Sequence, residues 1–226
     1  NHPEVPSNKI LCDDITSIVS SIDTMIKNEI DVIIGGPPCQ SFSSANQQRI
    51  IDDPRNILYK YFIEATKKIK PKFIIMENVR GMKKVASQVV EDFQQIGYEV
   101  EYTLFNAYEF SVPQNRTRLI YIGIKKEFSL KQNITPKTII ENINKEINKQ
   151  PKYVLKDALF KIKNLECAKI KNITEEDCEL SGKKIDINIF KDLGNDYLKL
   201  INENKTFEFI FNHKARYQNE INQKIY

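Results

Sequence analysis

Cys39 lies in a stretch whose residue types suit a reactive thiol. The run at residues 35–43 is GGPPCQSFS, so glycines and prolines lead directly into the cysteine. An isolated cysteine is more often a small buried apolar residue than a nucleophile. The prolines and glycines here instead predict a rigid, exposed loop, where a packing cysteine is seldom needed. A thiolate held in such a loop can act as a covalent catalyst.

Two further groups suit the same chemistry. Glu77 directly follows the apolar run at 73–76, which favours partial burial over the solvated position that is usual for a glutamate at a strand end. Arg116 and Arg118 alternate just before the apolar run at 119–123, so they share one face if a strand begins there. They are either two solvated arginines or a pair of planar donors for a carbonyl or phosphate oxygen. The sequence leaves both interpretations open.

Short apolar strands alternating with amphipathic helices must position these residues. We expect strands near 31–36, 72–76, 98–105 and 118–124, and helices near 15–30, 56–69 and 85–96. This alternation predicts an α/β domain with a mainly parallel sheet. Ligands of such sheets bind beyond the carboxyl ends of the strands, so neighbouring strands would bring Cys39 and Glu77 to one edge.

Composition sets outer limits on the function. The 226 residues are 41% hydrophobic, enough to build a core, and no apolar run approaches the roughly 20 residues that a membrane span needs. The four cysteines are widely spaced and form no Cys-x-x-Cys pair, which argues against a disulfide framework or a zinc site and favours a reducing, cytoplasmic setting. The net charge of +4 is compatible with a nucleic-acid partner without indicating one.

The chain changes character near residue 127. Before that point it alternates between strand and helix patterns, whereas the later part is rich in Asn, Lys, Glu and Ile, with helical patches at 137–147 and 154–163. We therefore predict a catalytic core over residues 1–127 and a mostly helical connector over 128–226.

Four motifs in register resemble the central motifs of the DNA cytosine-5 methyltransferases, in particular the bacterial restriction-modification type. They are PPCQSFS at 37–43, DPRNIL at 53–58, ENV at 77–79 and Gln-x-Arg-x-Arg at 114–118. The resemblance covers roughly residues 8–126. The QSFS continuation is similar to the DNA enzymes rather than to the related transfer-RNA branch. The resemblance implies a Rossmann-like, S-adenosylmethionine-dependent methyltransferase sheet.

The resemblance also implies a reaction, namely methyl transfer from S-adenosylmethionine to C5 of cytosine in double-stranded DNA. Cys39 would add to C6 of a flipped base, protonated Glu77 would donate to N3, and Arg118, with Arg116, would address the O2 side. The remaining expected contacts are to substrate by Gln40, Ser41, Ser43, Asn78 and Gln114, and to cofactor by Asp14, Pro37 and Leu58. Independently of the resemblance, Asp13 or Asp14 is a candidate N-cap for the helix beginning at Ile15.

Other features of the family are not found in these 226 residues. None of the seven glycines forms the Gly-x-Gly loop that follows the family's first strand, and the region that reads DNA sequence is expected beyond Tyr226. We therefore expect a sheet without that first strand, in a larger or split enzyme whose complementary chain supplies the missing segments. The alternative is a catalytically silent remnant that binds nucleic acid or a partner chain.

Overall fold

The computed structural model of the chain consists of two compact units. The first comprises Asn1–Ser111 and Asn115–Pro151, and the second comprises Val112–Gln114 and Lys152–Tyr226. The residues that the structure describes are 6, 10–26, 28–38, 58–160, 185–186, 194–203 and 209–210.

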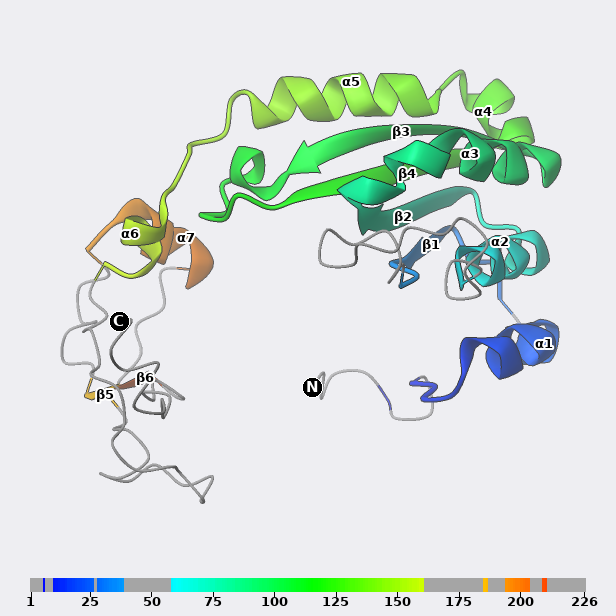
Figure 1. Ribbon diagram of the computed structural model, residues 1–226, viewed down its shortest axis with the longest axis horizontal. Coiled ribbons are helices and arrows are strands. Elements are labelled where there is room, and N and C mark those ends of the chain that lie inside the picture. Colours follow the sequence, from blue (N-terminus) through cyan, green and yellow to red (C-terminus); the bar gives the residue numbers. More distant parts are fainter. Residues whose placement is uncertain are drawn as a thin grey trace. The chain divides into compact units, whose positions relative to one another are not determined.

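A mixed four-stranded sheet forms the centre of the first unit, with the strand order β1-β2-β4-β3 (Figure 1). β1 (Val32–Gly35) runs parallel to β2 (Phe73–Val79). β4 (Thr117–Lys125) runs antiparallel both to β2 and to β3 (Tyr98–Asn106). The expected α/β class is confirmed, but the expectation of a mainly parallel sheet is wrong. Residues 107–116 alone join β3 to β4, fewer than the dozen or so that a parallel crossover needs.

Helices flank this sheet at positions close to those expected. They are α1 (Ile15–Met25), α2 (Leu58–Ile69), α3 (Ala86–Gln95), α4 (Lys126–Gln132) and α5 (Pro136–Ile147), with 3₁₀ turns η4 (Arg80–Val85) and η5 (Ala107–Phe110). α1 is shorter than expected because Ile26 already has an extended backbone. α2 ends before Lys70, which takes a positive φ of 53° ahead of Pro71. α4 was not expected.

The main core lies between the sheet and helices α2 and α3. Phe62 of α2 packs edge-to-face on Phe93 of α3, with ring centroids 6.2 Å apart. Ile74 and Met76 of β2 meet these helices together with Leu119 of β4. α1 joins through a smaller cluster with α2, and α5 packs on β3 and β4 (Figure 1). The strands that carry the candidate site residues are thus fixed on a packed core.

The second unit contains short elements in its described part. α6 (Leu155–Ala158) packs on α7 (Asp196–Ile201), and the Asn195 side-chain amide donates to the carbonyl of Asp157 at 2.9 Å. β5 (Ile185–Asp186) pairs with β6 (Phe209–Ile210). The predicted functional division at residue 127 stays a prediction. The first compact unit itself continues through α4 and α5 to Pro151. Among the described helices, none combines the length and apolar character needed to cross a bilayer.

Candidate active site at the carboxyl ends of β1 and β2

The carboxyl ends of β1 and β2 lie side by side. Gly35 is in register with Met76, so the chain leaving β1 runs next to residues 77–79. The side chain of Asn78 is only 3% exposed, and its Nδ2 donates to the carbonyl of Pro37 at 3.0 Å. Its Oδ1 accepts from the backbone N–H of Val79 at 2.8 Å. Asn78 therefore fastens the start of the Pro-Pro-Cys loop to β2.

Glu77 belongs to the last three residues of β2, whereas the sequence predicted that the strand would end just before it. The strand continues to Val79, and Glu77 is opposite Ile120 of β4. The neighbouring pair is Val79 with Arg118, so Glu77 and Arg118 are diagonal neighbours on one face of the sheet. The Arg118 Nε lies 2.7 Å from Glu77 Oε1, and the two side chains are 25% and 43% exposed, respectively. The expected partial burial of Glu77 is confirmed.

This ion pair fixes geometry more than it stabilises the fold. Pairs that remain this accessible to water contribute about 0–1 kcal/mol because solvent screens them. Besides its Nε contact to Glu77, Arg118 uses Nη1 to donate to the carbonyl of Thr117 at 2.9 Å. A carboxyl group and a guanidinium are thus held against each other at the end of the β2–β4 ladder, where both can contact one planar ligand.

Gly36 adds a contact that sequence reasoning missed. A Cβ atom built on Gly36 would lie 3.1 Å from Oε2 of Glu77 and 3.9 Å from the Glu77 carbonyl oxygen. The backbone after β1 therefore approaches the carboxylate more closely than a side chain would comfortably allow. Two consecutive glycines at the end of the apolar run indicate that another group lies close to the backbone there. The sequence alone does not show that this group is the Glu77 carboxylate.

The two arginines of the Gln-x-Arg-x-Arg motif do not share a strand. β4 begins at Thr117, so Arg118 lies in the strand and Arg116 precedes it. Arg116 is exposed, and no ion pair joins its side chain to another described residue. The predicted shared face required β4 to begin at or before Arg116, and it begins one residue later.

Asp14 is the N-cap of α1, which confirms one of its two interpretations. Its Oδ1 accepts from the Thr16 hydroxyl at 2.6 Å and from the Thr16 backbone N–H at 2.9 Å. These bonds, the hydroxyl first, lower the pKa of the Asp14 carboxyl below its ordinary value. Both bonds end on Oδ1, so Oδ2 can still accept from a ligand while the cap is intact.

The other predicted site residues belong to different parts of the chain, and some of them lie outside the described residues. Pro37 and Leu58 are half-buried, after β1 and at the start of α2. Gln114 is exposed and belongs to the second compact unit. The predicted nucleophile and its neighbours lie outside the described residues, and these are Cys39, Gln40, Ser41 and Ser43.

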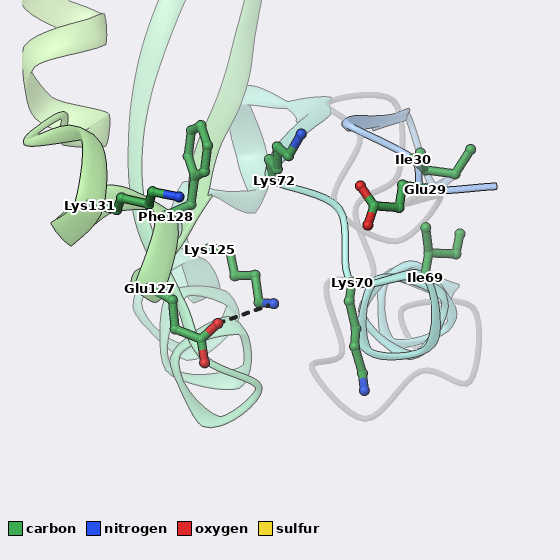
Figure 2. Close-up of a pocket in the computed structure, with 9 residues that line it drawn as sticks. All are labelled: Glu29, Ile30, Ile69, Lys70, Lys72, Lys125, Glu127, Phe128 and Lys131. Carbon is green, nitrogen blue, oxygen red and sulfur yellow. Dashed lines mark ion pairs between the residues drawn. The ribbon is translucent and has the colours of Figure 1, made fainter.

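A cavity of about 390 Å³ occupies a different part of the first unit (Figure 2). Lys72, which precedes β2, lines it together with Lys125 at the end of β4 and Phe128 of α4. Lys72 pairs with Asp31 at 2.5 Å, and this partner raises the pKa of the lysine. Lys72 marks the amino end of β2 whereas Glu77 is near the other end, and no predicted site residue lines the cavity. We therefore place the candidate active site at the strand ends.

Comparison with known proteins gives the family of the chain. The C-5 cytosine-specific DNA methylase family matches residues 1–226, which is the whole sequence. The chain belongs to this family. The resemblance to DNA cytosine-5 methyltransferases, which rested on four short motifs, is confirmed. Methyltransferases of this family use S-adenosylmethionine and act on DNA.

Several of the curated proteins that this chain resembles are type II methyltransferases. M1.HphI of Haemophilus parahaemolyticus is 39% identical over 131 residues, covering 53% of this chain and 35% of the relative. M.FnuDI of Fusobacterium nucleatum is 39% identical over 153 residues, covering 65% and 42%. A solved structure described as a putative DNA modification methyltransferase, encoded within an Escherichia coli prophage, matches with a TM-score of 0.49 and 26% identity, over 72% of this chain and 44% of that one. Each of these matches spans less than half of the relative.

Proposed function

We propose that this chain transfers a methyl group from S-adenosylmethionine to C5 of cytosine in double-stranded DNA, as part of a larger or split enzyme. The observation that carries the proposal is the arrangement at the end of β2, where Asn78 bonds to Pro37 and Glu77 pairs with Arg118. This brings the loop that leads to Cys39 next to an acid and a guanidinium, in a chain that belongs to the DNA methylase family. The matched region spans 35% and 42% of two relatives, which supports a larger working unit.

The thiolate of Cys39 opens the proposed reaction. Cytosine C5 is a weak nucleophile until a group adds at C6. Attack by the Cys39 thiolate forms a carbon–sulfur bond at C6 and pushes electron density toward N3 and C5. Glu77 is the proposed donor of a proton to N3, and the Arg118 guanidinium supports the charge on the O2 side. The 2.7 Å contact between Glu77 and Arg118 is consistent with these two roles, because O2 is attached to C2, the ring atom next to N3.

S-adenosylmethionine, when bound, supplies an electrophilic methyl group that C5 takes up. Loss of the C5 proton to solvent, with return of the N3 proton to Glu77, then breaks the carbon–sulfur bond and frees Cys39 as a thiolate. Asp14, Pro37 and Leu58 would hold the cofactor. Asp14 fits this role because its Oδ2 can still accept from the adenine amino group while Oδ1 caps α1. The Pro37 carbonyl retains a second lone pair beyond its bond to Asn78.

The substrate base must leave the DNA stack before these groups can reach it. C6 of a paired cytosine is inaccessible to a side chain, so the base is rotated out of the duplex into the site. We propose that Gln40, Ser41, Ser43 and Gln114 contact the extruded nucleotide or its backbone, whereas Asn78, also predicted to contact the substrate, is buried and instead holds the carbonyl of Pro37. Arg116, exposed just before β4, is suited to the flanking phosphate or to the O2 side of the base.

Covalent trapping tests the proposal directly. DNA carrying 5-fluorocytosine cannot lose a proton from C5 after methylation, so the Cys39 adduct should persist in denaturing gels. We expect a stable adduct when the full chain, its complementary segments and S-adenosylmethionine are all present, and none with Cys39→Ser. DNA binding without any adduct under these conditions would contradict the proposal and support the silent remnant.

A further inference from the structure

Asn106, the last residue of β3, forms hydrogen bonds to residues at both ends of the connection between β3 and β4. Its Oδ1 accepts from the backbone N–H of Tyr108 at 3.1 Å and from the backbone N–H of Arg116 at 3.2 Å. Its Nδ2 donates to Oδ1 of Asn115 at 2.7 Å, and its own backbone N–H donates to Glu109 at 3.2 Å. One amide side chain therefore joins both ends of the segment that connects β3 to β4.

These bonds fall where β4 begins. Asn106 is opposite Thr117 in the β3–β4 ladder, and Phe105 is opposite Arg118. The backbone N–H of Ala107 donates to the carbonyl of Arg116 at 2.9 Å, which adds a main-chain bond beside the Asn106 bonds. The backbone of Arg116 is consequently held on both its N–H and its carbonyl, immediately before Arg118 enters the strand.

We propose that Asn106 is a positioning residue for the methyl-transfer site, acting through Arg116 and Arg118. By closing the β3–β4 connection at Arg116, its amide sets the start of β4 and the place where the Arg118 guanidinium meets Glu77. This inference rests on the proposed function for its catalytic consequence, but its geometric part concerns the chain alone. Asn106 contacts neither substrate nor cofactor in this scheme.

An amide suits this position better than any other side chain of similar size. The oxygen serves two backbone N–H groups with its two lone pairs, and the nitrogen supplies a donor at the same time. A carboxylate keeps the two acceptor bonds and loses the donor, which Asn115 can offset by turning its own amide. An alanine loses all three side-chain bonds and leaves the Arg116 N–H without its partner.

The test compares Asn106→Ala with Asn106→Asp and with the control Asn115→Ala, which removes only the bond between the two side chains. In the full chain we expect Asn106→Ala to speed amide exchange at Arg116 by about tenfold, the effect of one lost hydrogen bond. The Arg118 Nε–H resonance, which reports the pair with Glu77, should shift and exchange faster. Asn106→Asp should restore most of both signals, and Asn115→Ala should leave them nearly unchanged.

Activity supplies the second readout. With the complementary segments present, Asn106→Ala should lower kcat by about tenfold while KM for S-adenosylmethionine stays the same. Unchanged Arg116 exchange and an unchanged Arg118 resonance in Asn106→Ala would overturn the inference. Altered signals with a normal kcat would show that Asn106 only stabilises the β3–β4 connection, and would overturn its proposed effect on methyl transfer. If the wild-type chain transfers no methyl group, the proposed function fails, and the two spectroscopic readouts still decide whether Asn106 positions Arg118.

Discussion

Adjacent residues at the end of β2 perform two different tasks because a strand alternates its side chains. Glu77 points to the face that carries Arg118, and Asn78 points to the other face, where it is buried and bonds to Pro37. One strand end thus supplies the acid and anchors the loop that leads to the proposed nucleophile. A shift of β2 by one residue would exchange the two faces and lose both contacts.

Replacing the Glu77 carboxyl group by an amide of the same shape tests its proposed role. We expect Glu77→Gln to slow adduct formation with 5-fluorocytosine DNA by about a hundredfold, because an amide cannot protonate N3. The free energy of unfolding should change by less than about 1 kcal/mol, since the Arg118 pair is partly exposed to water. Glu127→Gln is the matched control, as it disrupts the more exposed ion pair with Lys125. Equal adduct rates for Glu77→Gln and wild type would refute the role.

The two consecutive glycines after β1 should respond differently to alanine. A Cβ on Gly36 meets Oε2 of Glu77 at 3.1 Å, so Gly36→Ala should displace the carboxylate, reduce methyl transfer and leave the melting temperature nearly unchanged. A Cβ on Gly35 would lie 2.5 Å from the Phe62 ring, and overpacking of this kind costs about 1–3 kcal/mol. Thermal melts and methyl-transfer rates of both variants give the comparison. A Gly36→Ala protein with full activity would show that Glu77 does not need this space.

At the scale of single elements, the connection after η5 contains a residue in an unfavourable backbone conformation. Ser111 has φ 63° in the left-handed region, and its hydroxyl donates to the carbonyl of Pro151 at 2.7 Å. Ser111→Gly should relieve about 1 kcal/mol of strain and lose a hydrogen bond of about the same value, so its stability should match wild type. Ser111→Ala keeps the strain and loses the bond, so it should be about 1 kcal/mol less stable. Urea unfolding of both variants tests this, and an alanine variant as stable as wild type would contradict it.

The N-cap of α1 predicts the direction in which the stability of the folded chain changes with pH. Because the Thr16 bonds lower the pKa of the Asp14 carboxyl, the folded state favours its charged form. This stabilisation is present above the ordinary aspartate pKa of about 3.9 and is lost as the pH falls through the lower folded value. Asp14→Asn retains a capping oxygen without the charge. Wild type should therefore exceed Asp14→Asn in urea midpoint at pH 7, and the difference should shrink toward pH 3. A difference that does not depend on pH would argue against the assigned cause.

Most elements could be predicted from apolar periodicity, but the direction of β4 and the end of β2 could not. Periodicity shows that residues 117–125 form a strand without showing which way it runs, and the short connection at 107–116 decides that. β2 extends through Glu77 and Asn78 because β4 pairs with those polar residues, and this pairing leaves no sign in the local pattern. α4 follows β4 with no glycine or proline between them, so the sequence lacked a boundary signal.

The residue types of the site were predictable, and the contacts among them were not. Glu77, Asn78 and Arg118 were predicted from their places in motifs that resemble those of the family. The bond from Asn78 to Pro37 and the place of Asn106 depend on strand register and on side-chain direction across a connection. Both are settled by the packed structure. Sequence patterns record which groups are present, whereas register decides which of them touch.

For the whole first unit, the core between the sheet and its two central helices should dominate stability. Phe93 is fully buried against Phe62, and its replacement by alanine leaves a cavity next to β2 and β4. We expect Phe93→Ala to lower the free energy of unfolding by about 3–5 kcal/mol. Leu130→Ala, at a position 73% exposed on α4, should cost less than about 0.5 kcal/mol. Similar denaturation midpoints for the two variants would show that this core is not what holds the unit together.

The antiparallel placement of β4 between β2 and β3 also has a consequence for the order of folding. β3 and β4 are neighbours in sequence, so their hairpin closes a short loop and can form early, while β2 must dock from a greater sequence separation. Glu77 and Arg118 come from strands on either side of that later docking step. We expect the Glu77–Arg118 contact to form only when β2 docks on β4, so a partly folded chain can contain the β3–β4 hairpin without this pair.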